Sequence, residues 1–192
     1  MTWLPGLKPV RSQNHHDGSG DSWFTPRAIV DAAAEAMGSI DLDPCAHPAA
    51  PVWQFAKHKI AMCEGGDGLV DPWPGVGGVW CNPPYSDVAP WLKRCRAAAE
   101  SRPVIMMIPT RPETKAWSTY VLNAGACIVQ QVGRVRFVGL DGQTHGNGMV
   151  TTCFVTWSVD LARKLRQALQ VRNIAAHVLR VDNGANDAAG SR

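Results

Sequence analysis

The chain of 192 residues lacks an apolar run of the ~18 residues that a membrane-spanning helix needs. Its first twenty residues also lack the apolar core of a secretion signal. We therefore expect a cytoplasmic protein with no membrane partner. Hydrophobic residues make up 45% of the sequence and charged residues 18%, a balance that is typical of a globular domain with a buried core.

Paired cysteines are absent as well. The six cysteines are scattered without a Cys-x-x-Cys pair, and several stand in apolar surroundings, so we expect reduced, buried thiols and no disulfides. Cys45, His47 and Asp43 resemble a fragment of a metal site. Because no second ligand pair accompanies them, we expect no bound metal.

A large charge imbalance is also missing, since the formal net charge is only +3. The basic residues are nevertheless concentrated after residue 85. Arg111, Arg134 and Arg136 lie next to turns in this half and are candidates for DNA phosphate contacts, with solvated surface charges as the alternative. Arg134 and Arg136 are two apart, so in a strand they would share one face while Val135 packs on the other.

Short apolar runs alternate with helical patterns between residues 25 and 130. We expect strands at 40–42, 77–80, 104–108 and 126–130, and helices at 26–37, 87–99 and 113–122. Thr25 is the predicted cap of the first helix, Gly38 its end, and Ser86 or Asp87 the cap of the second. Residues 45–74 predict loop, with one short strand or helical turn near 55–61. Alternating strands and helices indicate a parallel sheet covered by helices.

The C-terminal part has a different pattern. Residues 135–138 and 150–157 are strand-like and are separated by a glycine-rich loop at 139–148, which predicts an antiparallel ribbon. A helix is expected at 161–169, whereas 174–181 is ambiguous. The predicted fold class is therefore α/β, a mainly parallel sheet flanked by helices with an antiparallel C-terminal ribbon. We predict a single domain at 21–182, a flexible lead-in at 1–20 and a disordered tail at 183–192.

An Asn-Pro-Pro-Tyr tetrad at 82–85 follows the second predicted strand. Pro83 and Pro84 fix φ and remove two backbone donors, so a stiff turn follows the strand. The Asn82 side-chain oxygen and the Pro83 carbonyl can accept the hydrogens of a nucleobase amino group, and Tyr85 offers a ring for stacking. The alternative is a proline-stiffened loop whose asparagine caps the next helix.

Ligands of open α/β sheets gather at the carboxyl ends of the strands. Asp43, Asn82 and Pro109 each follow a predicted strand, so we expect them to converge. Asp41 and Asp43 alternate along an extended segment, so only one can face a ligand directly. A turn-forming aspartate before proline is the alternative for Asp43. Cys81 precedes Asn82 on the strand and is expected to pack in the core, with nucleophilic attack on a pyrimidine ring as the alternative.

The tetrad and four further blocks, at 21–26, 40–46, 67–69 and 133–137, together resemble the phage-type Dam family of DNA N6-adenine methyltransferases. The resemblance implies a Rossmann-like methyltransferase fold, the cofactor S-adenosylmethionine, double-stranded DNA as partner, and direct transfer to the N6 amino group of a flipped adenine. It implies catalytic roles for Asn82, Pro83, Pro84 and Tyr85. It places the cofactor near Trp23, Thr25, Pro26, Asp41, Asp43, Pro44 and Asp67.

Three alternatives share these motifs. The same tetrad can hold the N4 amino group of cytosine or the amide of a protein glutamine, and a catalytically inactive DNA-binding relative would keep the scaffold. The intact tetrad and Asp43 argue against such decay. Where many Rossmann-like methyltransferases carry a Gly-x-Gly turn after the first strand, this chain has Asp-Pro-Cys-Ala at 43–46, as the amino-methyltransferase subgroup does.

Overall fold

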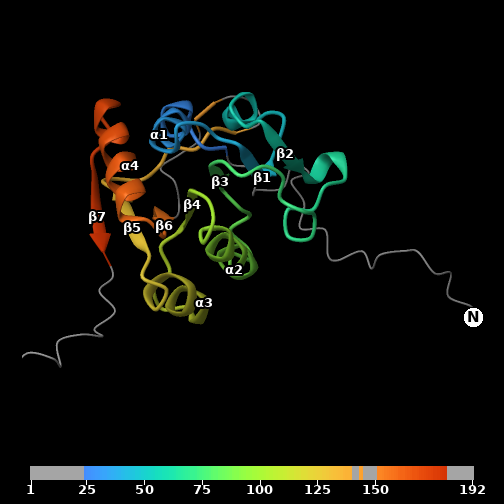
Figure 1. Cartoon of the computed structure of the whole chain (residues 1–192). Helices are drawn as coiled ribbons and strands as arrows, with labels where there is room; N and C mark the ends of the chain where they lie inside the picture. The colour runs from blue at the N-terminus through green and yellow to red at the C-terminus, as the bar shows by residue number, and fades with distance from the viewer. Residues whose placement is uncertain (1–23, 140–142, 145–150, 181–192) are drawn as a thin grey trace, which may run out of the picture.

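Seven strands form one mixed sheet with helices on both faces in the computed structural model, which describes residues 24–139, 143–144 and 151–180 (Figure 1). The strand order is β2-β1-β3-β4-β6-β5-β7. The strands are β1 Leu42–Ala46, β2 His58–Ala61, β3 Val79–Cys81, β4 Val104–Pro109, β5 Cys127–Gln131, β6 Thr152–Thr156 and β7 Ala176–Arg180. The parallel core and antiparallel C-terminal strands confirm the predicted α/β class.

The first four strands are parallel, so their carboxyl ends lie along one edge of the sheet. β4 is buried over its whole length, because it lies in the middle of the sheet with helices on both sides. The prediction of a strand at 104–108 is confirmed. β2 lies within the segment where one short strand or turn was expected, and it forms the edge beside β1.

The C-terminal strands are arranged differently from the predicted ribbon. β6 lies between β4 and β5 and is antiparallel to both, and β7 pairs antiparallel with β5. Residues 135–138 form no strand, and among the described residues they form bridges only through Val138. Because 152–156 pairs with β4 and β5 instead, the predicted ribbon of 135–138 with 150–157 is wrong. The physical reason is burial: every residue of β6 is buried, so this strand is stabilised in the sheet interior, which a two-stranded ribbon does not provide.

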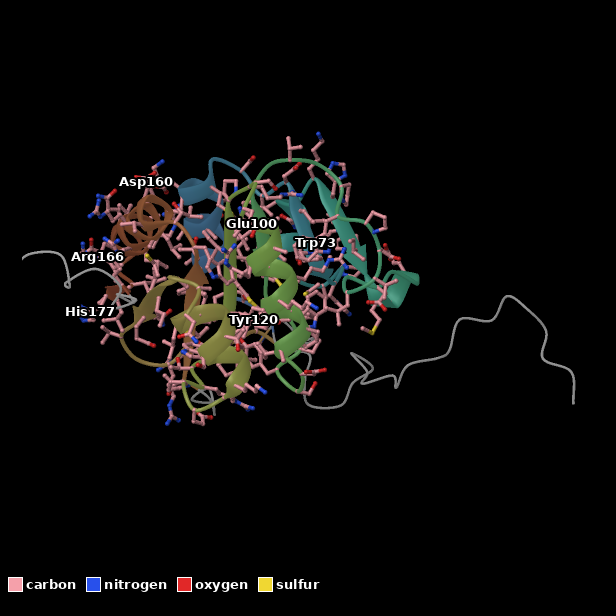
Figure 2. All side chains as sticks on the ribbon, turned by 60° about the horizontal axis from the view of Figure 1, so that its bottom comes forward. Trp73, Glu100, Tyr120, Asp160, Arg166 and His177 are labelled. Carbon is pink, nitrogen blue, oxygen red and sulfur yellow. The ribbon has the colours of Figure 1, made fainter. Side chains whose placement is uncertain are left out.

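Helices cover each face of the sheet. α1 (Arg27–Met37) and α4 (Val159–Val171) pack on one face, and α2 (Ala89–Ala98) with α3 (Lys115–Trp117) and its continuation η3 (Ser118–Leu122) pack on the other. The second face is turned toward the viewer in Figure 2, where Tyr120 lies on η3. Strand alternation divides the core accordingly: in β4, Met107 packs with α1 and α4, whereas Met106 packs with α2.

Two predicted helix caps are wrong. Thr25 makes no capping hydrogen bond, because Pro26 occupies the N-cap position of α1 and the Thr25 hydroxyl is bonded elsewhere. α2 begins at Ala89 after Val88, without a side-chain cap from Ser86 or Asp87. Gly38, at φ 83°, ends α1 as predicted, since a left-handed conformation favours glycine.

β1 begins later than predicted. The strand starts at Leu42, so Asp43 and Pro44 lie inside it and Asp41 precedes it. Two short 3-10 helices, η1 (Pro51–Gln54) and η2 (Met62–Glu64), flank β2. Trp23, the predicted lead-in, the predicted tail and most of the 139–148 loop lie outside the described residues. Within the described part of the chain, no helix has the length and apolar character to cross a bilayer.

Candidate active site

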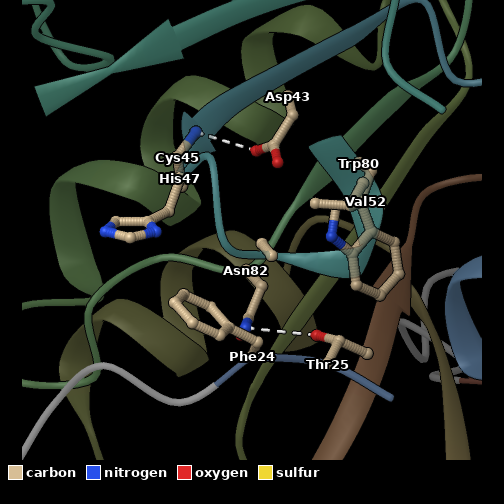
Figure 3. A pocket seen from close by; sticks show the side chains of 9 residues that line it. Phe24, Thr25, Asp43, Cys45, His47, Val52, Trp80 and Asn82 are labelled. Atoms are coloured by element: carbon tan, nitrogen blue, oxygen red, sulfur yellow. Dashed lines mark hydrogen bonds between the residues drawn. The ribbon is translucent and has the colours of Figure 1, made fainter. Parts of the chain in front are cut away.

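A pocket lies at the carboxyl ends of β1 and β3, as expected for an open α/β sheet (Figure 3). It encloses about 360 Å³ of empty space, part of which is open to solvent. Its lining residues come from the segment before α1, from β1 and the stretch after it, and from β3 and the tetrad: Phe24, Thr25, Asp43, Cys45, His47, Ala50, Val52, Trp80 and Asn82. The structure therefore brings Thr25, Asp43 and Asn82 together.

Asn82 presents a buried, unpaired acceptor at this pocket. Its Nδ2 donates to Thr25 Oγ1 over 3.2 Å. Its Oδ1 is buried and has no hydrogen-bond partner among the described residues. Leaving a buried carbonyl oxygen unpaired costs ~1–3 kcal/mol, so the site favours a ligand that supplies a donor. A cap role for Asn82 is not observed, because α2 begins seven residues later without a side-chain cap.

Tyr85 packs against the aromatic residue of a distant segment. Its ring meets the Phe137 ring edge-on, with centroids 6.2 Å apart and an interplanar angle of 76°. The Tyr85 hydroxyl is buried without a hydrogen-bond partner in the part of the chain that the structure describes. Burial raises the pKa of this phenol far above its ordinary value. The ring is thus held by packing and not by its hydroxyl.

Asp43 is the carboxylate of the pocket. Its side chain is nearly inaccessible, at 2% exposure, and its Oδ1 accepts a hydrogen bond from the Cys45 backbone N–H at 2.9 Å. Burial raises the pKa of Asp43 from 3.8 to about 7, although the Cys45 N–H and the charge of Lys59 favour the ionised form. A cationic or hydrogen-donating ligand at the pocket would therefore promote ionisation of this group.

Asp41 does not line the pocket. Its Oδ2 accepts from the Gly77 N–H at 2.8 Å and lies 3.4 Å from Arg102 Nη2. The Gly77 hydrogen bond is the main reason that its pKa is lowered, and the charges of His58 and Arg102 add to the effect. A Cβ on Gly75 would lie 2.1 Å from Asp41 Oδ2, which shows how closely the loop before β3 encloses this carboxylate. Asp41 therefore anchors that loop.

Asp67 also lies away from the pocket, at the exposed start of a turn. Its Oδ1 accepts from the Leu69 N–H at 2.9 Å, and its own N–H donates to Asp71 Oδ2 at 2.7 Å. This turn brings Gly68 against β1, where a Cβ on the glycine would lie only 1.9 Å from the Pro44 carbonyl oxygen. The contacts of Asp67 and Pro44 thus shape the end of β1, and neither residue lines the pocket.

The segment 133–139 crosses the same edge of the sheet. Val135 and Phe137 are buried and Arg134 and Arg136 are exposed, so the predicted alternation holds although no strand forms. Phe24 and Val138 exchange two backbone hydrogen bonds of 2.8 and 2.9 Å, which attach the segment to the pocket wall. The Phe137 ring contacts Tyr85 of the tetrad, so the two exposed arginines lie on a surface segment that is packed against the tetrad. Arg111 is likewise exposed, two residues beyond β4.

Several pocket residues were not predicted as ligand contacts. Figure 3 shows Phe24 and His47 side by side, with ring centroids 5.0 Å apart, and Trp80 with Val52 across from them. The Ala49 N–H donates to His47 Nδ1 at 3.1 Å. Phe24 lies between Trp23 and Thr25, which were both predicted as cofactor contacts, so its position in the sequence could have identified it. His47 was considered only as a metal ligand, and the described residues contain no group of three or more His, Cys, Asp or Glu side chains arranged for a metal.

Cys81 packs in the core, as predicted. It points to the α2 face, opposite to Trp80 and Asn82, and its Sγ lies 3.7 Å from Cys45 Sγ. Burial raises the pKa of the Cys81 thiol well above its ordinary value, so the thiolate that nucleophilic attack requires is disfavoured. The described cysteines are free.

Comparison with protein families shows a match over most of the chain. The family model described as DNA N-6-adenine-methyltransferase (Dam) matches residues 12–177. This range includes the pocket, the tetrad and the segment 133–139. A comparison with curated proteins finds no match.

Proposed function

The chain belongs to the Dam family of DNA N6-adenine methyltransferases, and on this premise we propose which of its residues carry the reaction. Family membership establishes the activity: the enzyme transfers a methyl group from S-adenosylmethionine to the N6 amino group of adenine in DNA. The assignment of individual residues below is our proposal. The observation that carries it is the buried Oδ1 of Asn82 at the edge of the pocket, which has no hydrogen-bond partner in the described part of the chain.

The pocket has the chemistry that S-adenosylmethionine requires. Phe24 and Trp80 offer apolar, aromatic surface, and Asp43 offers an acceptor that a cationic or hydroxyl-bearing ligand would favour. When bound, the cofactor supplies an electrophilic methyl group on its sulfonium. We assign cofactor contacts to Asp43 and to the pocket wall at Thr25. Asp41, Pro44, Asp67 and Pro26, which do not line the pocket, we assign to the scaffold around it. The proposed contact of Trp23 lies outside the described residues.

Asn82 is proposed to hold the reacting nitrogen. The lone pair of an exocyclic amino group is delocalised into the base, which makes the nitrogen a poor nucleophile. If Asn82 Oδ1 and the Pro83 carbonyl accept its two hydrogens, the nitrogen can pyramidalise toward the methyl group. Holding the two reactants in line supplies much of the rate acceleration. Pro84 contributes by stiffening the turn that carries these acceptors.

Tyr85 is proposed to stack on the flipped base. Extruding a base from a duplex costs a few kcal/mol, and stacking on an aromatic ring returns ~1–3 kcal/mol. The edge-on contact with Phe137 sets the orientation of the Tyr85 ring. We propose double-stranded DNA as the substrate, with Arg111, Arg134 and Arg136 at its phosphates, because all three are exposed beyond strand ends on the pocket edge. The domain limits and the cytoplasmic location remain predictions from the sequence.

The test is methyl transfer from tritiated S-adenosylmethionine to unmethylated duplex DNA, followed by nucleoside analysis. The native enzyme should label N6-methyladenine, and Asn82→Ala should lower the rate by roughly 100-fold or more with cofactor affinity nearly unchanged. Asn123→Ala, the same type of truncation at an exposed position after η3, is the matched control and should keep the native rate. If Asn82→Ala kept most of its rate, the proposed amino-group contact would be wrong. Label in N4-methylcytosine would show that the site methylates cytosine, the alternative substrate.

A further inference from the structure

The Thr25 hydroxyl joins two residues that are distant in sequence. It donates to Met107 Sδ over 3.8 Å and accepts from Asn82 Nδ2 over 3.2 Å. Thr25 is 4% exposed and Met107 is fully buried, so solvent does not compete for these bonds. Thr25 makes no capping bond to α1, although its position directly before Pro26 suggested one. The hydroxyl is therefore committed to the active-site amide.

The chemistry of these three groups determines which way the amide faces. A hydroxyl has one hydrogen to donate, and a thioether sulfur can only accept. With the Thr25 hydroxyl donating to the Met107 sulfur, its oxygen offers lone pairs alone to Asn82. The amide must then turn its NH₂ toward Thr25, which leaves Oδ1 facing the pocket as the buried, unpaired acceptor.

We propose that Thr25 and Met107 are positioning residues that fix the orientation of the Asn82 amide. An amide rotated by 180° would present Nδ2 to the amino group of the target base, and two donors cannot bond to each other. Only the orientation that Thr25 selects is productive. The inference rests on the proposed role of Asn82, and it assigns to Thr25 a task in the methyl-transfer step beyond its place in the cofactor pocket.

The surrounding structure holds the three side chains in fixed places. Phe24 is paired through its backbone with Val138, and α1 begins two residues after Thr25, so the threonine is anchored on both sides. Met107 lies within the fully buried β4, and Asn82 follows directly on β3, the neighbour of that strand. The bonds thus connect the segment before α1 to the two central parallel strands.

Thr25→Val tests the proposal, because valine has nearly the same shape and lacks the hydroxyl. We expect the single-turnover rate to fall roughly five- to ten-fold, the effect of losing one hydrogen bond that selects the productive amide. Cofactor affinity, measured by calorimetry, should change less than about two-fold, because valine keeps the pocket wall at position 25 filled and the hydroxyl is already bonded to Met107 and Asn82. Thr25→Ser restores the hydroxyl and should recover most of the rate. A serine variant as slow as the valine variant would overturn the proposal.

Met107→Leu provides a second route if Thr25→Val does not fold. Leucine keeps the core filled and removes only the sulfur acceptor, so the threonine hydrogen can turn to the amide and allow the unproductive orientation. The rate should fall by roughly two- to five-fold, again with little change in cofactor affinity. Native rates in both Thr25→Val and Met107→Leu would show that the hydroxyl does not orient Asn82.

The Asn82→Ala background separates this inference from the proposed function. With the amide gone there is nothing to orient, so adding Thr25→Val should cause no further loss of rate. If it lowers the rate by the same factor as in the native background, Thr25 acts independently of Asn82 and the inference is wrong. If Asn82→Ala itself is fully active, the proposed role of Asn82 in holding the amino group is wrong, and the positioning role of Thr25 is wrong with it. If Asn82→Ala is inactive and Thr25→Val is native-like, only the positioning role fails.

Discussion

Replacing Asp43 by asparagine should stabilise the cofactor-free protein, and more so at high pH. Asp43 is buried, and its pKa is raised from 3.8 to about 7, so the native state binds its proton more tightly than the unfolded state does. The stability that protonated Asp43 contributes is complete below about pH 4 and is lost as the pH rises toward and beyond 7. Asparagine is neutral throughout and can still accept the Cys45 hydrogen bond through its oxygen.

The pKa values set the size of the effect. A shift from 3.8 to about 7 corresponds to roughly 4 kcal/mol once the group is ionised in both states. About half of this, ~2 kcal/mol, develops between pH 5.5 and pH 8. The free energy of unfolding of Asp43→Asn, relative to the native protein, should therefore rise by ~2 kcal/mol over this interval.

Urea unfolding at pH 5.5 and pH 8 measures the difference. Asp41→Asn is the matched control, because the pKa of Asp41 is lowered and its contribution is already complete at both pH values. This variant should be less stable than the native protein at both pH values, and the difference should change by much less than ~2 kcal/mol, because the Gly77 hydrogen bond is the main interaction of Asp41 and does not depend on pH. Cofactor titrations should show weaker binding for Asp43→Asn and native binding for Asp41→Asn. A stability difference for Asp43→Asn that is independent of pH would show that the pKa of Asp43 is not raised in the folded protein.

Three further changes test other parts of the site. Tyr85→Ala should weaken DNA binding by ~1–3 kcal/mol, whereas Tyr85→Phe should bind DNA and methylate like the native enzyme, since the hydroxyl has no hydrogen-bond partner among the described residues. An affinity equal to the native value in the alanine variant would exclude stacking. Replacing Arg134 and Arg136 together by alanine should make log affinity less steep against log salt by up to about two units, and an unaltered slope would place the phosphate contacts elsewhere. Gly68→Ala should lower the free energy of unfolding by about 1–3 kcal/mol or more, because the new Cβ would lie 1.9 Å from the Pro44 carbonyl oxygen. A melting temperature equal to that of the native protein would contradict the tight packing of this loop on β1.

The parts of the fold that could be predicted depend on local pattern. The apolar run of β4 and the glycine that ends α1 are local signals, and both elements appear where they were expected. The position of Asn82 after β3 follows from the same reasoning, because strand ends of a parallel sheet share an edge. Val135 and Phe137 are buried between exposed arginines as alternation predicts, even though no strand forms there.

The remaining features depend on contacts between distant segments. The apolar residues of β6 would also suit the inner face of a two-stranded ribbon. The pairing with β4 and β5 is what places β6 inside the sheet, and that pairing cannot be read from the local sequence. Thr25 before a proline has the local pattern of a helix cap, but Asn82 and Met107 bind its hydroxyl. Asp41 and Asp43 could not be distinguished by alternation alone. The Gly77 and Arg102 contacts of Asp41, which come from later in the chain, separate them.

The most direct test of the proposed amino-group contact is a crystal structure of the enzyme with S-adenosylhomocysteine and a duplex that contains its target adenine. We predict that the flipped base stacks on Tyr85, with its N6 atom within about 3.2 Å of both Asn82 Oδ1 and the Pro83 carbonyl oxygen. The cofactor product should occupy the pocket that Phe24, Asp43 and Trp80 line. A complex in which the N6 atom is bound by other acceptors, with Asn82 still bonded to protein alone, would show that Asn82 and Pro83 do not hold the target amino group.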